Sequence, residues 1–300
     1  MIISVSTGAF YKRCFSEIVK IISQTDCKNI ELCLNNTVAG LPLREIEKEI
    51  EKKNLTVTSI HAPFEFLWKP GENERSWIIK CVEYAKALGA ETITTHSLVN
   101  DGDGFEERHK RNLAEFLGGG IAVCTENMPR HTPSSPVPDS FLCRNEELLE
   151  FLDASGVPVT FDTTHFASHT GTLTDGYRLF KKHIRNIHIS DYSNGKEGTP
   201  TEFLCKEGTP TEFLCKEGTP TEFLCKEGTP TEFLCKEHMI LGTGSLPLRD
   251  FVKLLRGDGY AHLLTVELDL DNAKRNPAAD DKQAAEAINI SLRLISEAVG

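Results

Sequence analysis

The sequence predicts an α/β fold, a single-domain (β/α)8 TIM barrel, on three observations. Short β-rich runs alternate with longer amphipathic stretches, which is typical of parallel strands joined by crossover helices. Eight strand-like runs can be counted along the chain, the number that closes such a barrel. The length of 300 residues suits one barrel with a large core, so residues 1–300 are interpreted as one domain.

The predicted strands are short runs rich in apolar and β-branched residues, and turn residues precede some of them. Gly89-Ala90 comes before the fourth strand and Ser155-Gly156 before the sixth. The strands are centred on Ile3–Val5, Ile30–Cys33, Val57–Ile60, Thr92–Thr95, Ile121–Thr125, Val159–Phe161, Asn186–Ile189 and Leu264–Val266.

The predicted helices place apolar residues three and four positions apart, as helices that pack on a sheet do. A last helix, Gln283–Val299, would close the ring. The earlier ones are Phe15–Ser23, Leu43–Lys52, Trp77–Leu88, Asn145–Leu152 and Leu248–Leu255.

One region breaks the alternation. The decapeptide Glu-Gly-Thr-Pro-Thr-Glu-Phe-Leu-Cys-Lys occurs four times without change from Glu197 to Lys236. The unit is shorter than a solenoid repeat, and its Gly-Thr-Pro interrupts any helix or central strand. We predict that residues 197–236 are a mobile loop inserted after the seventh strand. Removing the four copies joins Lys196 to Glu237 and restores a connection of ordinary length.

The composition argues against several classes of protein. The 44 acidic and 33 basic side chains give a net charge of −11, which repels a phosphate backbone, and no basic cluster offsets it. No apolar run approaches the length of a membrane span, and Met1–Phe10 lacks the pattern of a signal peptide. We expect a cytoplasmic protein without a nucleic-acid or membrane partner. Whether it forms a homo-oligomer stays open.

The ten cysteines do not predict disulfides. Four of them belong to the repeat, and no pair has CxxC spacing. The other six have mostly apolar neighbours, which indicates buried free thiols: Cys14, Cys27, Cys33, Cys81, Cys124 and Cys143.

Carboxylates directly follow three of the predicted strands, at Glu126, Asp162 and Glu267. The carboxyl ends of barrel strands converge on one rim, so these side chains should meet in one pocket. A buried unpaired charge costs on the order of several kcal/mol, and three carboxylates together repel one another. A divalent cation with His188 as fourth ligand would relieve both costs. The sequence therefore predicts a metal site made by Glu126, Asp162, His188 and Glu267.

Further polar residues stand at the same strand ends or in the long loop, namely His61, His96, His165, Asp191 and His238. We consider them as substrate-binding residues or ligands of additional metal ions. For His61 or His96 taken alone, a hydrogen-bonded structural role is the favoured alternative. Five other histidines fall in predicted helices or loops, where we expect a structural or surface role: His109, His131, His169, His183 and His262.

In order and position, the motifs resemble those of the xylose-isomerase-like barrel superfamily. The superfamily contains sugar and sugar-phosphate isomerases and epimerases, and also metal-dependent abasic-site endonucleases (AP endonuclease family 2). The resemblance covers nearly the whole chain outside the repeat. It rests on Ser-Ile-His-Ala-Pro-Phe, Thr-Thr-His-Ser, Cys-Thr-Glu-Asn-Met-Pro, Thr-Phe-Asp-Thr-Thr-His-Phe, Asn-Ile-His-Ile-Ser-Asp, a histidine followed by Gly-x-Gly, and a final Thr-Val-Glu-Leu-Asp.

The resemblance implies that Glu126, Asp162, His188 and Glu267 hold a catalytic manganese, magnesium, cobalt or zinc ion. It also implies that Glu126 and Glu267 serve as acid and base. A metal that polarises a carbonyl stabilises an enediolate, so two carboxylates can remove and return the neighbouring proton. We therefore expect a metal-dependent isomerase or epimerase acting on a sugar, sugar phosphate or related polyol. Arg130 or Lys69 could meet a phosphate, although a solvated surface charge is the favoured interpretation of both.

Two alternatives stay open. In the endonucleases, His61 and His96 with Glu126 would match a second metal position, and His165 with His238 most of a third. The chain departs from that pattern at Lys236, where the endonucleases carry an aspartate and a lysine repels a cation. In the isomerases the same histidines would hold substrate hydroxyls or support the ligands. The other alternative is a non-catalytic binding barrel whose pocket the insertion occludes; the intact ligand set argues against it.

Overall fold

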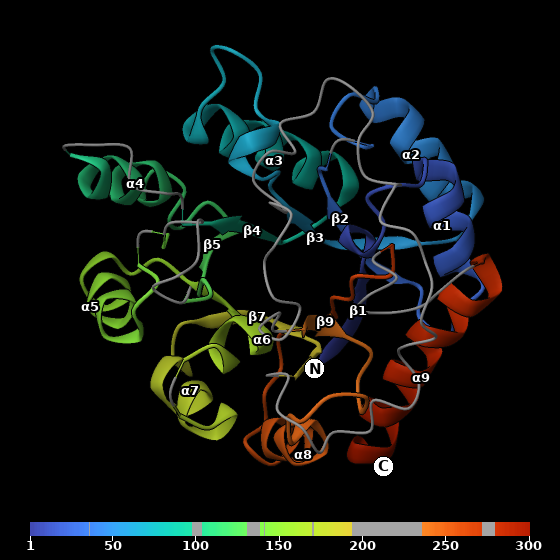
Figure 1. Cartoon of the computed structure of the whole chain (residues 1–300). Helices are drawn as coiled ribbons and strands as arrows, with labels where there is room; N and C mark the ends of the chain where they lie inside the picture. Colours follow the sequence, from blue (N-terminus) through green and yellow to red (C-terminus); the bar gives the residue numbers. More distant parts are fainter. Residues whose placement is uncertain are drawn as a thin grey trace, which may run out of the picture.

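The computed structural model shows eight parallel strands closed into a barrel and ringed by helices (Figure 1). It describes the chain except residues 36, 98–103, 131–138, 141, 170, 194–235 and 272–279. None of the described helices is long and apolar enough to cross a membrane.

The barrel strands follow one another around the ring, and the first and last pair to close it. Ile3 pairs with Leu264 in this closing ladder. The predicted barrel and all eight predicted strands are confirmed, with bounds shifted by at most two residues. The strands are β1 (Ile2–Ser6), β2 (Asn29–Cys33), β3 (Thr56–His61), β4 (Thr92–His96), β5 (Ala122–Glu126), β6 (Val159–Asp162), β7 (Ile184–Ile189) and β10 (Leu263–Val266).

Helices cover the outside of the barrel, and the predicted ones are all present. They are α1 (Phe15–Ser23), α2 (Leu43–Lys52), α3 (Glu74–Leu88), α5 (Asn145–Ser155), α8 (Leu248–Gly257) and α9 (Asp281–Val299). Three further helices were not predicted, namely α4 (Phe105–Ala114), the short α6 (Thr163–Ala167) and α7 (Leu173–Phe180), and neither were two 3-10 turns, Thr7–Ala9 and Glu65–Leu67.

The expected turn chemistry sets the ends of several helices. Asn73 accepts a hydrogen bond from the Ser76 backbone at the start of α3, and Gly89 ends that helix with φ 75°. Gly156 ends α5 in the same left-handed conformation, with φ 72°. These caps place the helices so that their apolar faces pack on the barrel.

The interior of the barrel is unusually polar. The hydroxyls of Ser4 and Thr265 lie 2.8 Å apart, and the Thr265 hydroxyl donates to Asn186 Oδ1 at 2.9 Å. On the other side of the interior, the hydroxyls of Thr94 and Thr160 also lie 2.8 Å apart. Barrel interiors are usually filled by branched aliphatic side chains. The apolar core of this protein lies mainly between the strands and the helices.

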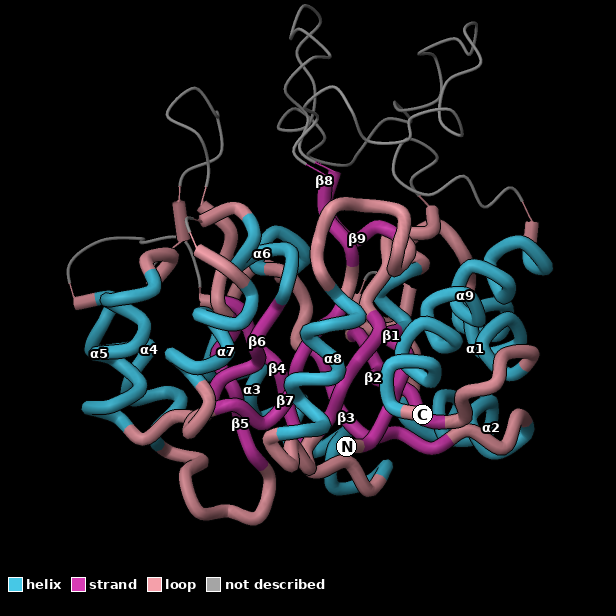
Figure 2. The backbone as a smooth tube through the Cα atoms, turned by 90° about the horizontal axis from the view of Figure 1, so that it is seen from below, coloured by secondary structure: helices cyan, strands magenta, loops and turns pink. Residues whose placement is uncertain are grey.

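A small antiparallel pair, β8 (Asp191–Ser193) and β9 (Lys236–Met239), stands beyond the barrel, at the end away from the N-terminus (Figure 2). Ser193 pairs with Lys236 and Asp191 with Met239, so β9 carries one extra residue. Within that bulge His238 has φ 52°. Apart from Lys236, the decapeptide repeat lies outside the described residues, and its predicted mobility stays a prediction.

The described cysteines are all free thiols, as predicted, and five are buried. Burial raises the pKa of Cys81 and of Cys124 to about 12. Cys14 is exposed, contrary to the prediction, because it caps the start of α1 at the surface.

Candidate metal centre

The four predicted ligands meet at the carboxyl ends of their strands. Glu126 ends β5, Asp162 ends β6, His188 lies near the end of β7, and Glu267 follows β10. The ladders place Asp162 beside His188 and His188 beside Thr265, so the side chains converge from adjacent strands. One ligand atom from each of the four residues lies within 4.8 Å of the others. That they bind a metal ion stays a prediction.

Glu126 lies at the middle of this group, fully buried, and faces four imidazoles. Its Oε1 lies 3.3 Å from Nδ1 of both His188 and His165. Its Oε2 lies 3.4 Å from Nε2 of His61 and 3.2 Å from Nε2 of His96. The carboxylate therefore connects His61 and His96 to the four predicted ligands.

Asp162 is held by its own short helix and by Asn127. Its Oδ1 caps α6, accepting from the His165 backbone at 2.6 Å and from the Thr164 hydroxyl at 2.9 Å. Asn127 Oδ1 accepts from the Asp162 backbone N–H at 2.7 Å, and Asn127 Nδ2 donates to the Asp162 carbonyl at 3.0 Å. Asp162 Oδ2 is buried and has no hydrogen-bond partner among the described residues. This oxygen remains available to a cation.

The two nitrogens of the His188 ring contact different carboxylates. Nδ1 lies 2.8 Å from Glu267 Oε2, on the side of the candidate metal centre, and Nε2 lies 3.2 Å from Glu31 Oε2. The Glu267 side chain is 16% exposed, whereas that of Glu126 is 1% exposed. Of the two predicted acid and base residues, Glu267 is thus the more accessible from solvent.

Electrostatics favour the charged form of most side chains in the group, although burial lowers the pKa of His96. Burial lowers an imidazole's pKa, but nearby carboxylates outweigh it and raise the pKa of His61 to about 9 and that of His165 to about 10. The pKa of His188 rises well above its ordinary value for the same reason. The pKa values of Glu126 and Glu267 are lowered, although burial raises them, because His188 is close.

The residues fit a divalent cation. Several carboxylates share one buried volume, and protons on the imidazoles supply the positive charge that a metal ion would otherwise bring. Asp162 Oδ2, which has no hydrogen-bond partner among the described residues, is a further potential ligand atom. Oxygen-rich ligation with one imidazole suits manganese, magnesium, cobalt or zinc without selecting among them.

Most of the other predicted rim residues join groups of potential metal ligands, whereas Asp191 has a structural role. His61, His96 and Glu126 form a second group with ligand atoms within 4.8 Å, and Asp162, His165 and His238 form a third. Asp191 joins none of the groups found among the described residues. Its carboxylate instead accepts four backbone N–H bonds, from Tyr192, Gly242, Gly244 and Leu246 at 2.8 to 3.0 Å. It therefore folds the Gly-x-Gly loop, and a Cβ at Gly244 would collide with it.

Two residues that contact the predicted ligands were not predicted from the sequence. Glu31, in β2, is fully buried and contacts His188. Asn127 holds the backbone of Asp162. A charged residue inside an otherwise apolar strand was a usable signal for Glu31, because both faces of a barrel strand are covered.

Three of the histidines predicted to be structural contact a carboxylate or a backbone carbonyl. His109 Nδ1 contacts Glu74 Oε1 in a buried pair, and His183 Nε2 lies 2.7 Å from Asp153. His169 Nε2 lies 3.1 Å from the Met128 carbonyl. His131 lies outside the described residues.

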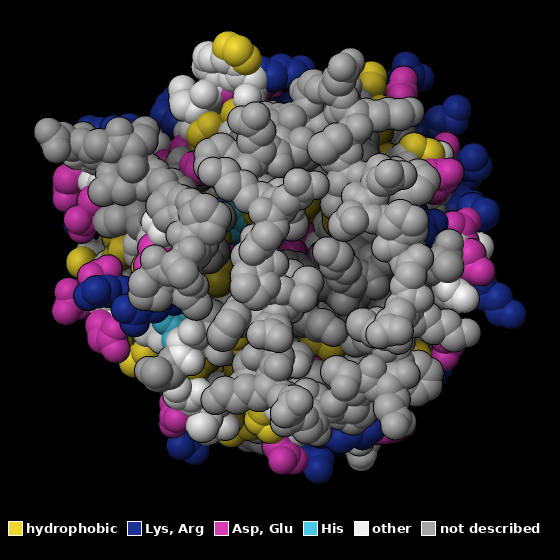
Figure 3. Space-filling model, viewed as in Figure 1, with side chains coloured by type: hydrophobic (Ala, Val, Ile, Leu, Met, Phe, Trp, Pro, Cys, Tyr) yellow, Lys and Arg dark blue, Asp and Glu magenta, His cyan; other side chains and the backbone are white. Residues whose placement is uncertain are grey.

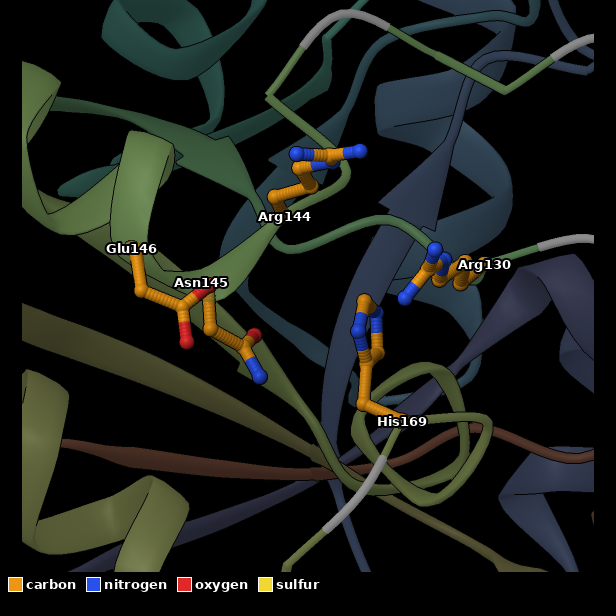
Figure 4. Close-up of a pocket in the computed structure, with 5 residues that line it drawn as sticks. All are labelled: Arg130, Arg144, Asn145, Glu146 and His169. Carbon is orange, nitrogen blue, oxygen red and sulfur yellow. The ribbon is translucent and has the colours of Figure 1, made fainter.

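A cavity of about 270 Å³ lies beside the loop that follows β5 (Figure 4). It is lined by Arg130, Arg144, Asn145, Glu146 and His169. His165 of the third group and the cavity residue His169 lie against the successive carbonyls of Asn127 and Met128.

Acidic and imidazole side chains thus gather at the carboxyl rim of a closed eight-stranded barrel. Sequence comparison identifies the family of barrels to which the chain belongs. The family model described as xylose isomerase-like TIM barrel matches residues 19–293, and the chain belongs to this family. No curated protein sequence is significantly similar to it.

Solved structures share the fold at low sequence identity. A D-tagatose 3-epimerase-like protein is 18% identical with a TM-score of 0.64 over 100% of both chains. A D-allulose 3-epimerase from Methylomonas sp. is 13% identical with a TM-score of 0.65, covering 99% of this chain and 98% of its own. An AP endonuclease, family 2, from Brucella melitensis is 16% identical with a TM-score of 0.65, covering 93% and 96%.

Proposed function

We propose that the protein is a divalent-metal-dependent isomerase or epimerase that moves a proton on a sugar, sugar phosphate or related polyol through an enediolate. The main support is the convergence of two glutamates on the same nitrogen of one imidazole. Glu126 Oε1 and Glu267 Oε2 lie 3.3 and 2.8 Å from His188 Nδ1. Similarity to epimerases of known structure adds to it.

Within this proposal the chain's own residues carry the proton. A bound divalent ion supplies Lewis acidity that polarises a substrate carbonyl. One glutamate, in its ionised form, removes the proton beside that carbonyl, and the other, which is protonated before substrate binds, gives its proton to the opposite face or to the neighbouring carbon. The two glutamates thereby exchange protonation states. Their lowered pKa values favour the ionised form, which is the form in which a glutamate acts as the base.

The test follows the proton directly. Metal-stripped protein is reloaded with Mn²⁺ and incubated in D₂O with a panel of ketoses and their phosphates. Deuterium incorporation next to the carbonyl, detected by NMR and abolished in Glu267→Gln, is the expected result. Absence of exchange across the panel, with full metal occupancy, would reject proton transfer on these substrates.

A second candidate, hydrolysis of abasic-site DNA, is favoured by one observation. Four overlapping groups of potential metal-ligand atoms meet at one rim, and Asp162 completes the group of His165 and His238 despite Lys236. Metal clusters of this kind hydrolyse phosphodiesters. Against it stand the net charge of −11 and the mixture of acidic and basic side chains seen around the edge of the rim face (Figure 3). Cleavage of an abasic-site oligonucleotide by the Mn²⁺ or Zn²⁺ protein distinguishes it.

A non-catalytic binding barrel would give a third pattern of results in these assays. Sugars would then raise the melting temperature of the metal-loaded protein, since a ligand of the native state stabilises it, without deuterium exchange or strand cleavage.

A further inference from the structure

Glu31 is an unexpected residue for the interior of a barrel. Its side chain is fully buried, and a buried carboxylate costs several kcal/mol, as an order of magnitude, unless it is paired. Two neighbours donate to the same oxygen, Oε2: the Ser59 hydroxyl at 2.9 Å and Asn186 Nδ2 at 3.2 Å. These hydrogen bonds fix the direction of the carboxylate.

The third contact of Oε2 reaches across the barrel. It is His188 Nε2, at 3.2 Å, on β7. In the ring of strands, β1 and β10 stand between β2 and β7, so Glu31 spans the interior to meet this imidazole. The opposite nitrogen, Nδ1, faces Glu126 and Glu267. Glu31 therefore lies beneath the candidate metal centre and contacts one of its predicted ligands from behind.

We propose that Glu31 is a positioning residue for the candidate metal centre. Its carboxylate accepts the Nε2–H of His188, which fixes the tautomer and the plane of the ring and directs the Nδ1 lone pair toward a bound cation. Carboxylates that orient a ligating histidine in this way also make the imidazole a better donor to the metal. The proposal rests on the metal dependence in the proposed function and is independent of the substrate.

A barrel-filling role is the alternative. If Glu31 only completed the polar interior, an aliphatic replacement that folds would leave metal binding unchanged. The barrel offers a matched control in Thr94, which is buried in the same interior and hydrogen-bonds to Thr160 across 2.8 Å.

The experiment measures the Mn²⁺ dissociation constant of the metal-stripped full chain by competition with a chelator. We expect Glu31→Gln to bind about 10- to 100-fold more weakly, as losses of such supporting residues usually do. Glu31→Leu should bind at least as weakly, Ser59→Ala should show a smaller loss in the same direction, and Thr94→Val should bind as the wild type does. Co²⁺ absorption spectra should change in the Glu31 variants and not in Thr94→Val.

Wild-type affinity in a folded Glu31→Leu protein would overturn the proposal. If neither Glu31 variant folds, unchanged affinity in Ser59→Ala would overturn it instead. A wild-type chain that binds no Mn²⁺ would also overturn it, because no centre would need positioning. Tight Mn²⁺ binding without proton exchange on any sugar would reject the proposed function alone.

Discussion

Among the described residues, imidazoles are buried against carboxylates in two places, and the two are built differently. Between α3 and α4, His109 Nδ1 contacts one oxygen of Glu74, and Asn112 Nδ2 donates to the other at 2.7 Å. Both carboxylate oxygens are engaged by this one small cluster. At the barrel rim, by contrast, one carboxylate, Glu126, faces four imidazoles and shares its space with two more acids.

The two clusters differ in how fully their carboxylate oxygens are engaged. Both oxygens of Glu74 are engaged, one by His109 and the other by Asn112. The rim cluster leaves a buried oxygen, Asp162 Oδ2, without a hydrogen-bond partner among the described residues, and its ligand atoms converge on a common volume. Substitutions in the two clusters should therefore fail in different ways.

The largest effect should follow loss of the acid and base at the rim. Glu126→Gln and Glu267→Gln should each reduce kcat at least about 100-fold, because each removes a proton-transfer group and a ligand charge. Circular dichroism should show a folded barrel in both. Near wild-type kcat in either variant would rule out the two-glutamate mechanism.

The next largest effect should be on metal content, which should fall after substitutions at the rim and not after substitution of His109. Asp162→Asn and His188→Ala should lose tightly bound metal, whereas His109→Ala should retain it, because His109 lies between helices away from the rim. Elemental analysis of the purified proteins is the measurement. Equal metal content in all three variants would contradict the ligand assignment.

The free energy of unfolding, unlike metal content, should depend strongly on the pair between α3 and α4. His109→Ala leaves the Glu74 carboxylate buried without its imidazole and should lower the free energy of unfolding by about 3–5 kcal/mol. The matched control is His183→Ala, whose partner Asp153 is exposed, and it should change stability little. Urea unfolding measures both; equal losses would mean that burial of the pair does not matter.

The pH dependence of stability should show whether protonated imidazoles at the rim stabilise the metal-free protein. His165, with a pKa of about 10, and His61, with a pKa of about 9, are protonated more readily in the folded chain than in the unfolded one. Their stabilising effect is complete below pH of about 6.5 and is lost as pH rises through 9 to 10.

Metal-stripped protein should therefore lose melting temperature between pH 7 and pH 10. Mn²⁺-loaded protein should lose less over this range, because the cation replaces those protons. The gap between the two should be the same in His109→Ala. A gap that does not widen with pH would show that rim protonation does not stabilise the metal-free fold.

The barrel could be predicted because its strands are short, apolar and regularly spaced. Helix α4 could not, since Phe105–Ala114 is mostly charged and lacks an apolar stripe. The rim carboxylates gave a strong signal because each directly follows an apolar run. Asp191, two residues beyond a predicted strand, was also a candidate, yet it binds the N–H groups of Gly242 and Gly244, and only the tertiary structure shows which backbone groups lie opposite a side chain.

The smallest effect should come from removing the repeat, and it tests how the rim cluster is held. His109 sits in a continuous helix, but His238 reaches the rim through the β8–β9 pair, whose connection contains the four decapeptides. Deleting Glu197–Lys236 puts Lys196 in the place of Lys236. The ladder partner of Ser193 would then be Lys196, separated from it only by Asn194-Gly195.

Asn-Gly is a strongly favoured two-residue turn for a β-hairpin, so the deletion should form a tight hairpin and keep His238 in its bulge. Loop length itself matters little, at about 0.6 kcal/mol per doubling. The shortened protein should match the full chain in melting temperature, Mn²⁺ content and oligomer size, with equal or higher activity, and protease should cut only the full chain between Lys196 and Lys236. A protected repeat, or loss of folding, metal or assembly on deletion, would instead show that the repeat supports the rim.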